Sequence, residues 1–130
     1  MSTILLSIKP EYSDRIFLGT KRYEFRRHLA QKNITKILVY STSPVMMVVG
    51  EVEVTDTLAM KPSPLWEETK KYAGITRIKF REYFAGCKMG YAYKLGKAQK
   101  YATPQPLSKY NINQAPQSFV YIDDKMVGEY

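Results

Sequence analysis

Short apolar runs, separated by polar and glycine-containing segments, recur along the whole chain. Continuous or alternating apolar residues are typical of strands, whereas apolar residues three and four positions apart are typical of helices. Six segments follow the strand pattern: 3–8, 21–27, 37–40, 46–58, 87–101 and 119–122. The run Ile37–Tyr40 is apolar at every position, so we expect it to be covered on both faces.

Three segments follow the helical pattern, and a glycine ends each of them. The first runs from Pro10 to Leu18, the second begins at Ser63 and Pro64, and the third begins at Thr76. In the third we expect Ile78, Phe80, Tyr83 and Phe84 on the buried side, with Arg77, Lys79 and Arg81 facing solvent. Residues 28–36 and 103–115 lack periodicity and are predicted to be loops.

The helices interrupt the strands without alternating with them regularly. This order favours the α+β class. We predict a small, mixed, partly open β-barrel of about six strands with two to three short helices. Residues 1–122 are expected to form one domain, and residues 123–130 a loose C-terminal tail.

Charge makes nucleic acid the leading class of partner. Among 130 residues, 20 are basic and 12 acidic, so the formal net charge is +8 and polyanions are attracted. Eleven tyrosines suit a β-rich domain, and one or two of them could also stack on bases.

Other functional classes find little support. With one cysteine and one histidine, the chain can form neither an internal disulfide nor a Cys/His metal site, and we expect no metal and no cofactor. The N-terminus lacks the pattern of a signal peptide, and no apolar run approaches a membrane span. We therefore expect no membrane contact and a cytoplasmic location.

The segment from Gly19 to Arg27 carries the densest candidate chemistry. Along a strand, Arg22, Glu24 and Arg26 share one face. A carboxylate between two guanidinium groups can pair with one and leave the other for an anion such as phosphate. The alternative is a charge ladder that stabilises the strand by a fraction of a kcal/mol per pair, about 0.5 kcal/mol.

Four motifs together resemble the ASCH domain, a PUA-like β-barrel family. They are Leu5-Leu6-Ser7-Ile8-Lys9-Pro10, the Gly-x-Lys-x-x-Glu-x-Arg segment at 19–26, Tyr40-Ser41-Thr42-Ser43-Pro44, and Gly90-Tyr91-Ala92. The similarity extends to about Ile122. It implies a cleft beside the first helix-strand junction, lined by Lys9, Lys21, Glu24 and Arg26, with Ser41, Thr42 and Ser43 beside it and Tyr91 near its mouth.

The first hypothesis is nucleic-acid binding, with RNA preferred over DNA. Lys21, Arg26 and Arg27 would contact phosphates, the hydroxyls of Ser41 to Ser43 would fix register, and Glu24 would orient Arg26 or accept from a base. A cleft suits a single strand with a splayed nucleotide. The resemblance also implies a link to RNA metabolism or transcription, and thus a protein partner there.

The second hypothesis is a hydrolase that uses Lys21 and Glu24. Some relatives of the fold resemble ribonucleases, and others amidohydrolases of acetylated cytidine. In the amidohydrolase pattern Glu24 stands where the threonine nucleophile would be, and no matching acid lies near Gly74. A third hypothesis is a reader of a small nucleotide. Catalysis requires the pKa of Lys21 or Glu24 to move towards neutrality, whereas a structural ion pair moves both away from it.

Overall fold

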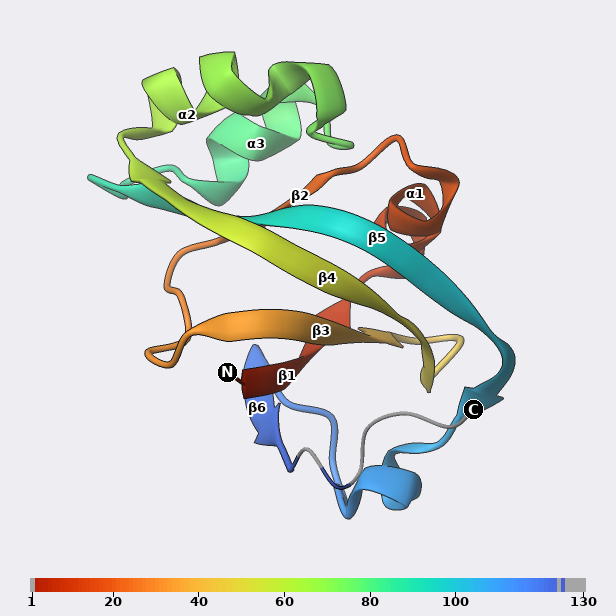
Figure 1. Cartoon of the computed structure of the whole chain (residues 1–130). Coiled ribbons are helices and arrows are strands. Elements are labelled where there is room, and N and C mark those ends of the chain that lie inside the picture. Colours follow the sequence, from red (N-terminus) through yellow and green to blue (C-terminus); the bar gives the residue numbers. More distant parts are fainter. Residues whose placement is uncertain (1, 124, 126–130) are drawn as a thin grey trace.

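One mixed sheet carries the fold (Figure 1). The computed structural model describes residues 2–123 and 125. Within them the strands lie in the order β2-β5-β4-β3-β1-β6. Their bounds are β1 Ser2–Ile8, β2 Tyr23–Arg26, β3 Ile34–Ser41, β4 Met47–Met60, β5 Gly90–Gln105 and β6 Phe119–Ile122. The helices are α1 Pro10–Leu18, α2 Pro62–Thr69 and α3 Arg77–Tyr83, with 3-10 turns at Lys70–Tyr72 and Leu107–Tyr110.

The sheet remains open, with β2 and β6 at its two edges. β1 and β3 are parallel, and the four other strand pairs are antiparallel. The long strands β4 and β5 curve across the molecule, with α2 and α3 together at one end, and β6 lies beside β1 at the far edge of the sheet. The predicted α+β class and the partly open six-stranded sheet are confirmed.

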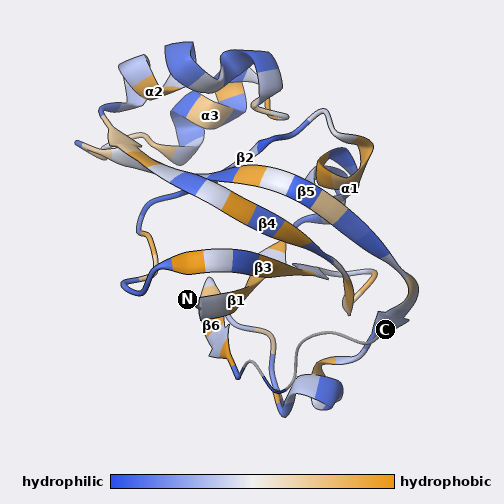
Figure 2. Ribbon diagram, in the orientation of Figure 1, coloured by the Kyte–Doolittle hydropathy of each residue, from blue (hydrophilic) through white to orange (hydrophobic). Residues whose placement is uncertain are grey.

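The central strands behave as the apolar pattern indicates. Residues Ile37 to Tyr40 of β3 are buried at every position, so the prediction of cover on both faces is confirmed. The register between β4 and β5 shifts between Val48 and Gly50, which marks a β-bulge. Apolar and polar bands alternate along β4 and β5 in Figure 2, which matches a strand with one face in the core.

The core beneath α2 and α3 is aromatic. The Phe25 ring from β2 lies 5.0 Å from the Phe80 ring and 6.2 Å from that of Phe84, both edge-on. Leu65 and Ala92 complete this cluster from α2 and β5. Because Phe25 is adjacent to Glu24 in the chain, packing of this cluster fixes where the charged residues of β2 lie.

Several predicted boundaries were wrong. The predicted loop 28–36 already contains the start of β3, because Ile34 pairs with Ser2 of β1 and is buried. The predicted connection 103–115 contains the end of β5 and a 3-10 turn whose Tyr110 is buried. Ile78, predicted to be buried, is 70% exposed, because α3 turns Phe80 and Phe84 towards the core in its place.

Two further predictions concern the C-terminal tail and contact with a membrane. Of the predicted tail 123–130, residues 123 and 125 are described, and the rest lies outside the described residues. Over residues 2–123 and 125, every helix is too short or too polar to cross a membrane.

Candidate functional site

A cleft of about 480 Å³ opens where the end of β1, α1, β2 and α3 meet. Four basic and two acidic side chains line it, together with three aromatic rings. The lining residues are Ser7, Ile8, Lys9, Tyr12, Lys21, Glu24, Phe25, Arg26, Ile75, Lys79, Glu82 and Tyr83. Cavities of this size accommodate small molecules or single groups of larger ones.

The junction between α1 and β2 places Lys21 at the floor of this cleft. Gly19 ends the helix with a left-handed φ of 86°, which favours glycine. The amides of Thr20 and Lys21 then both donate to the carbonyl oxygen of Arg15, at 3.1 Å. The Arg22 amide donates to the Tyr72 carbonyl at 2.8 Å, so the chain enters β2 in a fixed direction.

Lys21 is a buried amine held by a neutral group. Its Nζ donates to the carbonyl oxygen of Ala73 at 2.8 Å, while the nearest Glu24 oxygen is 3.9 Å away. The rings of Phe25 and Tyr12 lie 4.9 and 5.4 Å from Nζ. The side chain is only 3% exposed. The ammonium group therefore exchanges water for one carbonyl, two ring faces and a distant carboxylate.

Burial accordingly lowers the pKa of Lys21 below its ordinary value of 10.5. The Glu24 carboxylate opposes this shift, and the charges of Arg26 and Arg15 add to it. Catalysis requires a pKa shift in this direction, towards neutrality, whereas a simple structural ion pair would raise the pKa of Lys21. Burial also raises the pKa of Tyr83, so its phenol stays protonated at neutral pH.

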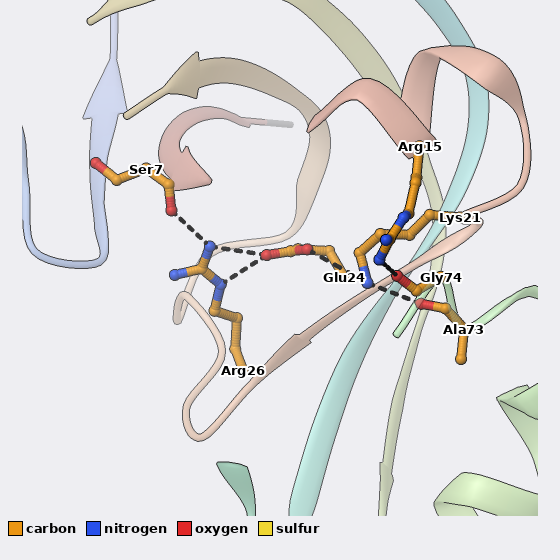
Figure 3. A network of polar contacts seen from close by, with 7 residues as sticks. All are labelled: Ser7, Arg15, Lys21, Glu24, Arg26, Ala73 and Gly74. Carbon is orange, nitrogen blue, oxygen red and sulfur yellow. Dashed lines mark hydrogen bonds and ion pairs between the residues drawn. The ribbon is translucent and has the colours of Figure 1, made fainter. Parts of the chain in front are cut away.

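Glu24 and Arg26 form the second part of the network (Figure 3). Both Nε and Nη2 of Arg26 donate to the same Glu24 oxygen, Oε2, at 3.2 and 2.8 Å. Nη2 also donates to the Ser7 carbonyl oxygen at 2.9 Å. Among the described residues Nη1 has no hydrogen-bond partner. One edge of the guanidinium is thus fixed by the protein, and one amino group is left for a ligand.

The structure brings together the four residues that the resemblance placed in the cleft: Lys9, Lys21, Glu24 and Arg26. Arg27 lies outside it, exposed, with its Nε bonded to the Tyr83 carbonyl at 3.0 Å and its guanidinium stacked on the Tyr83 ring.

The hydroxyl residues and Tyr91 are not among the lining residues either. Ser41 is buried, and its Oγ lies 3.1 Å from that of Ser13 on α1. Thr42 is half-buried and Ser43 exposed in the turn after β3. Tyr91 is half-buried in β5, paired with Arg26 across the strands.

Sequence reasoning missed the wall that α3 contributes. Lys79 and Tyr83 line the cleft, although the charges of α3 were predicted to face only solvent. Lys79 also pairs with Glu11 of α1 at 3.7 Å, which links the two walls. The spacing of Lys79, Glu82 and Tyr83 at i, i+3 and i+4 signals a common helix face. It does not tell which element that face meets.

Comparison with known proteins identifies the family and supports the fold. The ASCH domain matches this chain over residues 6–113, which is most of its length. The chain belongs to the ASCH domain family. The crystal structure of ASCH from Zymomonas mobilis has the same fold, with a TM-score of 0.88 and 25% identity, over 96% of this chain and 90% of that one.

Relatives of this ASCH domain differ in their names and lengths. The ASCH domain-containing ribonuclease of Zymomonas mobilis is 27% identical over 85% of this chain and 71% of its own length. A Ureaplasma parvum protein named ATP synthase subunit alpha is 31% identical over 92% of this chain and 15% of its own. The chain spans less than half the length of the Ureaplasma parvum relatives that it matches.

Proposed function

We propose that this ASCH domain binds RNA, and that the cleft receives one nucleotide of a single strand. The observation that carries the proposal is the Arg26 guanidinium, fixed on one edge by Glu24 and Ser7 while Nη1 remains free of described partners. A donor prepared in this way suits a phosphate oxygen and loses little freedom on binding.

The rest of the cleft fits a nucleotide. Lys9 and Lys79 are exposed at the rim, where they can neutralise neighbouring phosphates. The Tyr12 and Tyr83 rings offer apolar faces to a base or ribose. The other Glu24 oxygen, Oε1, lies 3.9 Å from Lys21 and can accept from a base amino group or a 2′-hydroxyl. A 2′-hydroxyl contact would favour RNA over DNA.

A binding experiment with a matched control tests this proposal. The rim variant Lys9→Ala/Lys79→Ala and the control Lys97→Ala/Lys100→Ala each remove two exposed positive charges, the latter from β5. We expect the rim variant to bind labelled single-stranded RNA about tenfold more weakly than the control. The slope of log affinity against log salt concentration should fall by the equivalent of about one to two phosphate contacts. Duplex RNA and DNA of the same sequence should bind less tightly. Equal losses in the two variants would mean diffuse attraction and would refute the cleft as the site.

Ribonuclease activity is the second candidate, and the lowered pKa of Lys21 favours it. A neutral Lys21 amine would take the proton of the 2′-hydroxyl as that oxygen forms a bond to phosphorus. The bond from phosphorus to the 5′-oxygen then breaks, and water protonates the leaving oxygen. Arg26 would stabilise the charge on the phosphoryl oxygens. A relative of this chain is named a ribonuclease.

Product analysis separates binding from cleavage. If the domain is a ribonuclease, RNA yields a 2′,3′-cyclic phosphate and a 5′-hydroxyl, DNA of the same sequence stays intact, and Lys21→Met abolishes cleavage. If the RNA stays intact during prolonged incubation with a protein that binds it, the domain binds RNA without cleaving it. Binding of free nucleotides but not of strands would instead indicate a reader of small ligands. On the basis of the family resemblance we also propose a protein partner in transcription and a cytoplasmic location.

A further inference from the structure

A second cavity, of about 320 Å³, lies between α2 and α3. Trp66 and Ser63 line it from α2, and Arg77, Phe80 and Arg81 from α3. None of these residues lines the first cleft. The i, i+3, i+4 spacing of Arg77, Phe80 and Arg81 places them on one side of α3, whereas Lys79, Glu82 and Tyr83 occupy the other. The two cavities therefore flank the same short helix.

The two arginines give this cavity its positive charge. Both are exposed, and neither forms an ion pair with a described residue. The carboxylate in the lining, Glu67, binds Lys70 at 2.7 Å. Arg77 and Arg81 lie one turn apart, so both guanidinium groups can reach one anion. Their planar forks suit the oxygens of a phosphate.

Trp66 adds an aromatic face to these charges. Its ring is half-buried and rests 5.0 Å from the Phe80 ring, which holds the indole in place while part of it lines the cavity. Every base can stack on such a ring regardless of sequence. An aromatic face beside two arginines matches the two ends of a nucleotide, its base and its phosphate.

The surface between the two cavities is the outer side of α3. Ile78 lies there, 70% exposed, between Glu82 on the cleft side and Arg81 on the other side. With side chains, a helix is about 10 Å across. A strand that occupies both cavities must span this width and fill each cavity, so it needs more than about 3 nucleotides. Ile78 offers an apolar contact at the crossing point.

We propose that the cavity between α2 and α3 is a second nucleotide site, which holds a base on Trp66 and a phosphate between Arg77 and Arg81. It rests on the proposed RNA binding: the strand whose nucleotide enters the cleft crosses α3 at Ile78 and continues into this cavity. The domain thus grips RNA on both sides of one helix. Strands too short to cross α3 gain nothing from the second site.

Trp66 is the only tryptophan of the chain, so its fluorescence reports directly on this cavity. We would titrate oligouridine of about 3 and about 10 nucleotides into the wild type, the variant Arg77→Ala/Arg81→Ala and the charge-matched control Lys97→Ala/Lys100→Ala. The expected result is quenching by the longer RNA and an affinity of the arginine variant for it about tenfold below the control. The affinity for the shorter RNA should equal that of the control.

The outcomes distinguish failure of this inference from failure of the proposed function. RNA binding at the cleft with unchanged Trp66 fluorescence, and equal affinities in the arginine variant and the control, would overturn the second site alone. An absence of RNA binding in every protein would overturn both. If an acidic peptide of matched charge displaces the longer RNA and quenches Trp66 more strongly than the RNA does, the cavity is a protein-docking site and the inference is wrong. Unchanged melting temperatures establish that each variant is folded.

Discussion

Gly74 lies directly against the side chain of Lys21, with no room for a further atom between them. A Cβ on Gly74 would overlap the Cβ and Cγ of Lys21, and the residue has a left-handed φ of 64°. The neighbouring carbonyl of Ala73 accepts the Lys21 ammonium, and Arg15 holds the Gly74 carbonyl at 2.9 Å. The segment between α2 and α3 thus fixes the position of the buried amine.

Gly74→Ala should therefore displace Lys21 as well as destabilise the protein. We expect a loss of about 3 kcal/mol in the free energy of unfolding, because overpacking adds to the backbone cost of a left-handed residue. RNA affinity or cleavage should fall too. Gly86→Ala is the matched control, since Gly86 has a φ of 80° and open space around its Cα, and should cost about 1 kcal/mol. Urea unfolding measures both. Equal costs in the two variants would contradict the contact with Lys21.

The lowered pKa of Lys21 predicts a stability that rises with pH. Between its native pKa and 10.5, the unfolded chain binds more protons at this site than the native protein does. The free energy of unfolding attributable to Lys21 therefore increases across that window and is constant below it. Tyr83 and Tyr93, whose pKa values burial raises above 10.0, act in the opposite direction at higher pH.

Comparison of the wild type with Lys21→Met isolates this effect, because the tyrosine contributions are common to both proteins. We expect the difference in unfolding free energy, wild type minus variant, to grow as the pH rises through the window that ends at 10.5. Lys94→Met, at an exposed position of β5, serves as the control and should show no such trend. A pH-independent difference for Lys21→Met would show that its amine is charged throughout this range.

Glu24 should matter far more than an exposed carboxylate in a similar pair. It is 8% exposed and compensates both Lys21 and Arg26, so Glu24→Gln leaves two cations with little neutralisation. The expected loss is about 3 kcal/mol. Glu67→Gln, which breaks the solvent-exposed pair with Lys70, should change the free energy of unfolding far less. Chemical denaturation compares them.

The same variant decides between a charge ladder and a ligand site. If Glu24→Gln lowers stability and leaves RNA affinity unchanged, the network has a structural role alone. Weaker RNA binding at a temperature where the variant remains folded would assign Glu24 and Arg26 to the ligand, because Arg26 depends on this carboxylate for its orientation.

The sequence predicted the charged residues of β2, but it did not predict which residues from other elements contact them. Alternation along the strand and the family motif identified Lys21, Glu24 and Arg26, because these features are local. That Lys21 bonds to the carbonyl of Ala73, far along the chain, depends on packing that no local pattern encodes. The contribution of α3 to the cleft has the same origin: helical spacing defines a face, but the fold decides what it meets.

Ser41 tests whether the family motif places a residue correctly at the ligand. The resemblance put its hydroxyl beside the ligand, whereas its Oγ lies 3.1 Å from Ser13 Oγ beneath α1. We expect Ser41→Ala to cost about 1 kcal/mol and to leave RNA affinity unchanged. Ser13→Ala/Ser41→Ala should cost more than the single change, because it also removes the hydrogen bond that Ser13 Oγ donates to the Pro10 carbonyl oxygen at 3.1 Å. Thermal unfolding and RNA titration of both variants measure this. Loss of RNA affinity in a folded Ser41→Ala protein would instead place the hydroxyl at the ligand, and the motif would have been the better guide.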